Sequence, residues 1–299
     1  MADVIILGSM ALDTIETPFG KAERILGGSA SYASYAASFF AKPAIISVIG
    51  EDFPENQKKV FLDRGISLEG VQEKGKTFHW EGFYEFDMNE AKTIKTELNA
   101  LASFSPIVPE SYKGIEHVFL ANIDPSAQLE VLKGLSNPGV IVMDTMNFWI
   151  EHKKKEVLEV MKRATIMLLN DGEARQMFQT TNLVNAAKQV LALGPEAVII
   201  KKGEHGALLF TKGHHFNAPG YPLEGVKDPT GCGYSFGGAL IGYLAKIKKH
   251  DQATLRKAMV YAGAIASFNA EDFSLQRLKT ITGKDIEQRY QEFVSMRNF

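Results

Sequence analysis

The chain is poor in cysteine, with Cys232 the only one among its 299 residues. A single thiol excludes an intrachain disulfide and a zinc site built from several cysteines. No charge of one sign is in excess either, because 33 Lys and Arg stand against 35 Asp and Glu, a net charge of −2. General nucleic-acid binders carry a basic excess on one face, so we expect no nucleic-acid partner.

Long hydrophobic runs are also missing. The first apolar run, Val4 to Leu7, follows no basic segment, and it is too short for a signal peptide or a membrane span. The sequence therefore predicts a soluble, intracellular protein, which we place in the cytoplasm, with no membrane partner. Hydrophobic residues make up 45% of the chain and charged residues 23%, which is typical of a globular protein.

Short apolar runs alternate with longer amphipathic ones. The runs expected to be strands are Val4–Leu7, Ile45–Ile49, Val118–Leu120, Val140–Met143, Thr165–Leu169 and Val198–Ile200. The segments expected to be helices are Ser31–Phe40, Glu55–Asp63, Gln128–Gly134, Lys153–Lys162, Gly172–Phe178 and Leu183–Leu193. Nearly continuous apolar strands are buried on both faces, and their alternation with helices predicts an α/β fold with a mostly parallel sheet between two helical layers.

Two segments break this alternation. Thr14–Ile25 has the pattern of a β-hairpin turning at Pro18-Phe19-Gly20, and Lys76–Asp87 reads KTFHWEGFYEFD, with aromatic residues at strand spacing. We expect the two to form a small β-sheet that stands off the main domain as a lid and excludes water from a reaction. The alternative is an edge extension of the main sheet.

Polar residues follow the predicted strands, where ligands bind in open α/β sheets. They are Gly8-Ser9, Gly50-Glu51-Asp52, Asn122-Ile123-Asp124, Asp144, Asn170 to Glu173, and Lys201-Lys202-Gly203. Carboxylates, amides and a lysine at one edge suit a polyhydroxylated substrate and a metal-bound phosphate. Helix capping is the alternative for part of this set, because Asp, Asn and Ser favour that position in any protein.

One segment matches the P-loop pattern. Gly70 to Thr77 reads GVQEKGKT, in agreement with G-x-x-x-x-G-K-[ST]. A P-loop must follow a buried strand and open a helix. Here the preceding residues are a weak strand and the following TFHWEGFYEF is a strand pattern, so we reject this segment as a phosphate site.

A better phosphate site begins at Lys227 and reads KDPTGCGYSFGG. Gly231 and Gly233 flank Cys232 and allow a sharp turn close to a ligand. The run then enters a long predicted helix, from Ser235 to about Lys246, whose first N–H groups and dipole attract an anion. The alternative is an ordinary loop–helix junction, with Gly237-Gly238 allowing close helix packing.

At this string the chain resembles the ribokinase-like (pfkB-type) family of carbohydrate and nucleoside kinases. That family's signature is D-[TP]-[TV]-G-A-G-D, and Asp228 to Tyr234 stands in its place. Gly8 to Asp13 with Gly27-Gly28 is similar to the family's acceptor-binding segments, and Gly50-Glu51-Asp52 to its G-x-D turn. Asn170 to Glu173 matches N-x-x-E, and Lys202 to Gly206 looks like the family's nucleotide-side turn. The likeness covers nearly the whole chain.

The resemblance implies a single ribokinase-like domain over residues 1–299, with a three-layer α/β/α core and a lid formed by about 13–27 and 74–104. It implies ATP as phosphoryl donor, Mg²⁺, a sugar or nucleoside acceptor, and a homodimer formed through the lid. It assigns an anion hole to Gly231, Cys232 and Gly233, and acceptor binding to Asp13, Gly27 and Gly28. Nucleotide binding falls to Asn170, Glu173, Lys202, Gly203, Gly206, Thr230, Gly231 and Gly233. Glu173 would act near Mg²⁺ indirectly, and Asp228 near a monovalent cation such as K⁺.

The residues themselves give Asp13 and the aromatic segment two interpretations each. A carboxylate at Asp13 can accept hydrogen bonds from a vicinal diol, or it can cap a turn. Four aromatic residues of the predicted lid can stack on a nucleobase or sugar, or simply form the packed side of the sheet. They are Phe78, Trp80, Phe83 and Tyr84, and their number favours a nucleoside acceptor slightly over a plain sugar.

Three positions depart from the family pattern. Tyr234 replaces the Asp that serves the family as catalytic base, Cys232 replaces Ala, and Tyr32 stands where many of the family's sugar kinases have Asn. A neutral phenol, with an ordinary pKa of about 10, is a poor proton acceptor at pH 7. The chain is therefore an ATP-dependent kinase with a lesion at the base, a silent nucleotide- or sugar-binding protein, or a kinase in which another carboxylate acts as base. The retained anion loop and N-x-x-E segment favour the first.

Overall fold

The computed structural model describes residues 2–297, and within them the main sheet has nine strands in the order β13-β12-β11-β10-β9-β8-β1-β4-β5. From β5 to β11 all neighbours are parallel, whereas β12 and β13 run antiparallel at one edge. The strands are β1 Val4–Leu7, β4 Pro43–Ile49, β5 Ser67–Glu73, β8 His117–Leu120, β9 Val140–Met143, β10 Ile166–Asn170, β11 Ala197–Lys201, β12 Ala207–Thr211 and β13 His214–Ala218.

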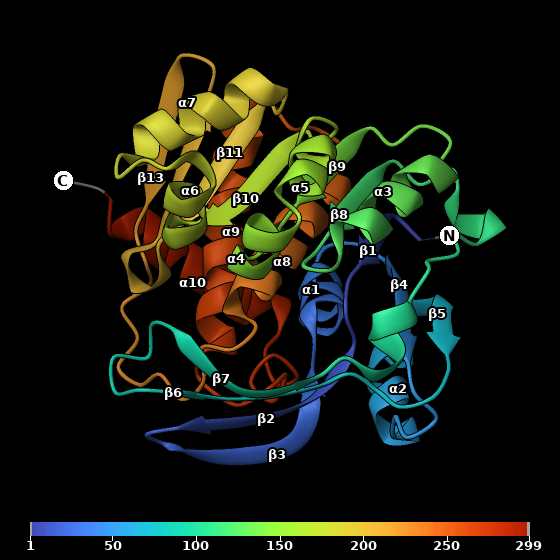
Figure 1. The fold of residues 1–299 in the computed structure, drawn as a ribbon. Helices are drawn as coiled ribbons and strands as arrows, with labels where there is room; N and C mark the ends of the chain where they lie inside the picture. The colour runs from blue at the N-terminus through green and yellow to red at the C-terminus, as the bar shows by residue number, and fades with distance from the viewer. Residues whose placement is uncertain (1, 298–299) are drawn as a thin grey trace.

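Helices cover both faces of this sheet (Figure 1). Alternate strand residues point to opposite faces, so Ile6 joins one apolar core while Ile5 and Leu7 join the other. The first core packs under α1 Ser29–Ala37, α2 Glu55–Leu62, α8 Cys232–Ile247, α9 Gln252–Asn269 and α10 Gly283–Ser295. The second packs under α3 Pro125–Gly134, α4 Asn147–His152, α5 Lys154–Met161, α6 Asp171–Phe178 and α7 Leu183–Leu193. The three-layer α/β/α prediction is confirmed.

A second, four-stranded sheet has the order β3-β2-β6-β7. Its strands are β2 Ala11–Thr17, β3 Gly20–Gly27, β6 His79–Tyr84 and β7 Ala91–Glu97. Two antiparallel hairpins meet along the parallel pair β2–β6. Because β2 begins four residues after the end of β1, this small sheet lies at the carboxyl edge of the main sheet (Figure 1).

The sequence patterns located the buried strands and their crossover helices to within a few residues. They missed the edge strands β5, β12 and β13, the short α4, and the last two helices, α9 and α10. The P-loop-like segment from Gly70 lies in β5 and the connection to β6, so it opens no helix. Short 3₁₀ turns complete the described elements: η1 Asn99–Ser103, η2 Glu110–Tyr112 and η3 Gly203–His205.

No helix within residues 2–297 has the length and apolar character needed to cross a membrane.

Candidate active site

The start of α8 lies at the centre of the carboxyl edge. Gly231 precedes the helix at a φ of 82°, and a Cβ added to it would lie 2.4 Å from the Tyr32 ring. The first amides of a helix have no intrahelical acceptor, and in the described part of the chain no other group accepts from the N–H of Gly233 or Tyr234. These two amides and the helix dipole form an anion-binding position.

The Cys232 side chain points away from that position. Its thiol donates to the Ala266 carbonyl oxygen of α9 at 3.4 Å and lies 3.5 Å from Asn269 Nδ2. Burial raises the pKa of Cys232 to about 12, so the thiol is protonated at neutral pH. Cys232 therefore fills space between α8 and α9. Its backbone N–H donates to the Pro229 carbonyl oxygen at 3.2 Å, so neither its thiol nor its amide is free for an anion.

Tyr234, in the first turn of α8, is held by a hydrogen bond. Its hydroxyl accepts from Asn122 Nδ2 at 3.1 Å, and Asn122 Oδ1 accepts from the Trp149 indole at 3.0 Å. Burial raises the pKa of the Tyr234 phenol well above its ordinary value, and three nearby carboxyl groups raise it further: Asp144, Glu173 and Asp13. The phenol is therefore neutral at pH 7 and keeps its proton available for donation.

An ion pair lies beside the same helix start. Lys201 Nζ contacts Asp144 Oδ1 at 3.1 Å and Oδ2 at 2.9 Å. The Asp144 side chain is only 1% exposed, and burial raises its pKa although Lys201 opposes the shift. A Cβ added to Gly233 would lie 3.4 Å from this ammonium, so Lys201 reaches the first turn of α8.

Asn170 and Glu173 form a capping box at the start of α6. The Asn170 side chain accepts from the Glu173 N–H at 2.6 Å, and the Glu173 carboxylate accepts from the Asn170 N–H at 2.7 Å. The spacing N-x-x-E thus has a structural role of its own. Burial and then the charge of Asp144 raise the pKa of Glu173 to about 7.

Asp13 also lies near Tyr234, because its charge contributes to raising the pKa of the phenol. It is in β2, where the register with β3 shifts between Asp13 and Ile15. A Cβ added to Gly27 would lie 1.8 Å from Asp13 Oδ2, so the carboxylate occupies the space that any other residue at Gly27 would need. Burial, with a smaller effect of the Asp228 charge, raises the pKa of Asp13 to about 7. Gly28 has a φ of 93° and a backbone contact with Ser9, which only glycine tolerates.

Three buried polar atoms beside Asp13 have no hydrogen-bond partner within residues 2–297: Asp13 Oδ1, Tyr32 Oη and Asp228 Oδ2. The other oxygen of Asp228 accepts from the Thr230 N–H at 2.9 Å. Thr230 Oγ1 in turn donates to the Tyr84 hydroxyl at 3.1 Å, which joins β6 of the small sheet to the anion loop. Buried polar atoms without partners are costly, so these three mark a place suited to a polar ligand, an ion or water.

The turn from Lys202 to Gly206 follows β11. Gly206 has a φ of 83°, and a Cβ there would lie 2.1 Å from the Ala218 carbonyl oxygen of β13. Gly203, at a φ of 54°, lies near Asn89 of the turn between β6 and β7. Both positions thus have a positive φ that favours glycine. The tip of the small sheet, at Asn89, extends to this turn.

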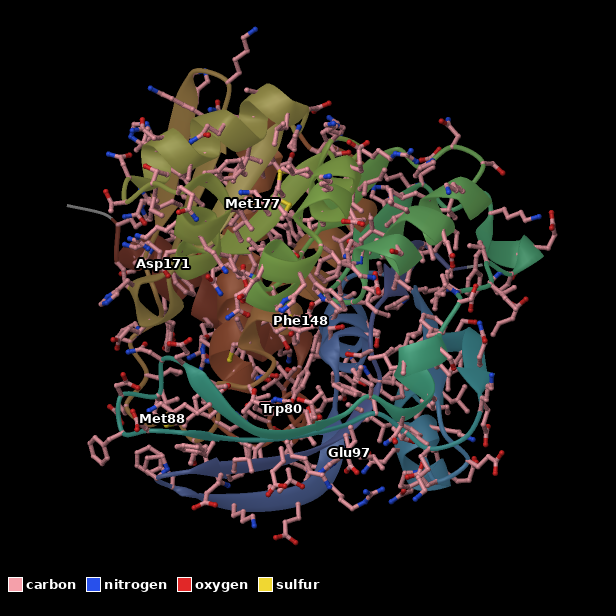
Figure 2. The ribbon with its side chains drawn as sticks, viewed as in Figure 1. Trp80, Met88, Glu97, Phe148, Asp171 and Met177 are labelled. Carbon is pink, nitrogen blue, oxygen red and sulfur yellow. The ribbon has the colours of Figure 1, made fainter. Side chains whose placement is uncertain are left out.

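Helix α4 contacts the site through Trp149, whose indole N–H donates to Asn122 Oδ1. Figure 2 shows Phe148 between α4 and the small sheet in this view, with Trp80 of β6 below it. Phe148 is 47% exposed, whereas its neighbour Trp149 is engaged with Asn122. Trp80 Nε1 donates to Thr93 Oγ1 of β7 at 3.1 Å, so that ring is fixed within the small sheet.

The structure brings two groups of expected residues together around Tyr234. One group lies beside the ion pair of Lys201 and Asp144 and contains Gly233 and Glu173. The other lies around Asp13 and contains Gly27, Gly28, Asp228 and Thr230. Sequence reasoning placed polar residues at the strand ends but did not select Asn122, Asp144 or Lys201. Their only sequence signal was their position directly after strands of a parallel sheet.

The donor set suits a metal–nucleotide ligand. Mg²⁺ is commonly bound by one or two carboxylates together with substrate phosphates, and Glu173 and Asp144 are carboxyl groups beside a ready anion position. Within residues 2–297 no cluster of three or more His, Cys, Asp or Glu could hold a metal by itself. A metal that arrives with a phosphate ligand fits these residues better than a resident one.

A parallel α/β core, an anion-binding helix start and a carboxylate beneath a small sheet together are the features of an α/β protein suited to binding a phosphate group. The pfkB family carbohydrate kinase model matches residues 1–281. The chain belongs to this family.

Known proteins similar to the chain include a cytidine kinase from Thermococcus kodakarensis. It is 30% identical over 250 residues, which are 81% of this chain and 89% of the relative. Among solved structures, an E. coli protein described as a candidate ribokinase II, solved with ATP and Mg²⁺, aligns with a TM-score of 0.81 and 20% identity over 98% of this chain and all of that one. A Burkholderia thailandensis nucleoside kinase in complex with inosine aligns with a TM-score of 0.75 and 19% identity over 99% of this chain and all of that one. These two structures establish the shared fold.

Proposed function

We propose that this chain is an ATP-dependent kinase that phosphorylates a hydroxyl group of a nucleoside, with sugars as the second acceptor class, and that Tyr234 slows the transfer. The observation that carries the proposal is the position of Tyr234 in the first turn of an anion-binding helix, close to the buried Asp13 carboxyl group. The names of the relatives, a cytidine kinase and a nucleoside kinase, support a nucleoside acceptor.

On the nucleotide side, the anion loop of Gly231, Cys232 and Gly233 would surround the phosphate oxygens. The unpaired N–H groups of Gly233 and Tyr234 would donate to them, whereas the Cys232 N–H donates to the Pro229 carbonyl oxygen at 3.2 Å. Asn170, Glu173, Thr230 and the turn Lys202, Gly203 and Gly206 would bind the rest of the nucleotide and its metal, with Glu173 acting on Mg²⁺ indirectly. When bound, Mg-ATP supplies the phosphoryl group and a cation that offsets its charge. The free oxygen of Asp228 is the donor that we propose for a monovalent cation such as K⁺.

On the acceptor side, Asp13 would accept hydrogen bonds from sugar hydroxyls through the oxygen that has no protein partner. Gly27 leaves room for that carboxylate. Tyr234 stands where the family has a base, but its neutral phenol, which accepts a hydrogen bond from Asn122, can donate its proton in a hydrogen bond and takes no proton at pH 7. Positioning and electrostatic stabilisation, which dominate phosphoryl transfer, are retained.

We also propose that residues of about 13–27 and 74–104 act as a lid within a single domain, 1–299. The hydrogen bond between Tyr84 and Thr230 supports closure over the site. Large apolar side chains, among them Phe19 at 59% and Phe86 at 86% exposure, lie on this sheet and its turns. Such a surface suits the homodimer through the lid that the family resemblance implies.

A second candidate function is nucleotide or sugar binding without turnover. The hydrogen bond from Asn122 to Tyr234 favours it, because it fixes a neutral phenol at the position of the base.

The test is ADP release from Mg-ATP with cytidine, other nucleosides and ribose, using the parent chain and Tyr234→Asp, with Asp13→Asn as the acceptor-site control. Release that depends on one acceptor and falls in Asp13→Asn would support the kinase. Binding of Mg-ATP with no turnover in either chain would favour the silent binding protein.

A further inference from the structure

We propose that Lys201 binds the phosphoryl group that this kinase transfers, and that Asp144 is the positioning residue that holds the Lys201 ammonium. The inference rests on the proposed function. It assigns a role to a buried ion pair that the family resemblance did not select.

The position of the lysine is the first argument. Lys201 ends β11 and Asp144 follows β9, and β10 lies between these strands. The Lys201 side chain therefore crosses the carboxyl end of β10 to reach Asp144. A Cβ added to Gly233 would find Lys201 Nζ at 3.4 Å as its sole neighbour within 4 Å. The space beside this ammonium thus opens toward the first turn of α8.

The hydrogen bonds of the ammonium are the second argument. A lysine ammonium has three N–H donors, and Asp144 accounts for two of them. In the described part of the chain no acceptor takes the third. The same holds for the N–H groups of Gly233 and Tyr234. Three unpaired donors therefore lie around one small volume, which matches the three terminal oxygens of a phosphoryl group.

The burial of the pair is the third argument. Removing a charged pair from water often costs as much as the pair returns, so a buried ion pair is weak evidence of a stabilising role. The Lys201 side chain keeps 17% exposure while Asp144 keeps 1%. The more exposed member of the pair is thus the cation. An anionic ligand can therefore reach the ammonium, as the proposed role requires.

The charges nearby limit which ligand suits this cation. The Lys201 charge lowers the pKa of both Asp144 and Glu173 against the effect of burial, so two carboxyl groups lie close to one ammonium. A nucleotide that carries Mg²⁺ fits this balance better than a free polyanion. The probe ligands are therefore Mg-ATP and Mg-ADP, which differ by the transferred group.

The test compares two variants that differ only in the lysine. Lys201→Met alone would leave Asp144 buried and unpaired, which costs stability. Asp144→Asn avoids this problem and keeps a side-chain oxygen that can accept a hydrogen bond from the Lys201 ammonium, and the double variant Asp144→Asn/Lys201→Met leaves no unpaired charge. Lys162→Met, directly after α5, controls for a lost charge elsewhere. Affinities for Mg-ATP and Mg-ADP are measured by isothermal titration calorimetry, and folding by thermal unfolding.

We expect Mg-ATP to bind about 10- to 100-fold more weakly to the double variant than to Asp144→Asn, the range for a lost charge-assisted hydrogen bond. The affinity for Mg-ADP should change less than threefold between these two variants, and Lys162→Met should match the parent. Equal Mg-ATP affinity in the two variants, or an equal loss for Mg-ATP and Mg-ADP, would overturn the role of Lys201 and leave the proposed function standing. A parent chain that binds neither nucleotide would overturn both.

Discussion

Replacing Tyr234 by Asp should raise the rate of phosphoryl transfer by about 10²–10⁴, the usual contribution of a general base. Because burial raises the Tyr234 pKa above its ordinary value of 10.0, fewer than about 1 in 10³ molecules carry a phenolate at pH 7. An Asp side chain has an ordinary pKa of about 3.9. The burial and carboxyl groups that raise the pKa of Tyr234 would raise that of Asp as well, but from a starting value about six units lower, so its ionised fraction at pH 7 is far larger than that of the phenol. The expected gain corresponds to about 3 to 5 kcal/mol of transition-state stabilisation.

The assay is steady-state ADP release at saturating Mg-ATP over the acceptor panel. The matched control is Tyr234→Phe, which keeps the ring and removes the hydroxyl that accepts from Asn122. It should show no gain in rate and a loss of about 1 kcal/mol in the free energy of unfolding. Equal acceleration in the Phe and Asp variants would refute the reasoning, because relief of crowding would then explain the gain. An unchanged rate in Tyr234→Asp, with a parent chain that is already fast, would show that another group serves as base.

Three further results are expected. In Gly27→Ala the new Cβ would lie 1.8 Å from Asp13 Oδ2, so the carboxylate must move. The KM for the acceptor should therefore rise at least about 10-fold. The affinity for Mg-ATP, measured by calorimetry, should stay unchanged. Because the Asp13 pKa rises from 3.8 to about 7 on folding, the folded state holds more protons than the unfolded state between these values and loses stability as pH rises. In urea unfolding across pH 4–7, the free energy of unfolding of Asp13→Asn should therefore fall less with rising pH than that of the parent, by up to about 4 kcal/mol. The same pH dependence in both chains would contradict this assignment. Tyr84→Phe removes the acceptor of the Thr230 hydroxyl, so amide exchange in β6 should quicken relative to β9, and unchanged exchange would count against a latch between the small sheet and the anion loop.

The central strands were predictable because they are buried on both faces. Runs such as Val140–Met143 read as continuous apolar segments, and they match the observed strands closely. The edge strand β13 is mostly exposed and contains His214 and His215, so no apolar run marked it. The last helix, α10, has two fully buried residues, Ile286 and Phe293, too few to stand out from the polar residues around them.

The candidate site was predictable where a residue acts through its own backbone or its neighbours in the chain. The capping box of Asn170 and Glu173 and the positive φ of Gly231 are local, so short spacing reveals them. Asn122 and Lys201 were not selected, because each acts on a residue distant in the chain. Asn122 bonds Tyr234, 112 positions away, and Lys201 bonds Asp144, 57 positions away.

Local pattern and chemistry in the chain were enough to establish the parallel α/β core, the turn that starts α8, and the absence of a carboxylate at Tyr234. These features depend on burial periodicity and on the identity of single residues. Folding was needed to place Asp144, Lys201 and Asn122 around that helix start and to press the Asp13 carboxylate against Gly27. The physical reason is that parallel strands bring their carboxyl ends to one edge, whatever their separation in the chain. Which side chains meet there depends on strand order, which a single sequence does not state.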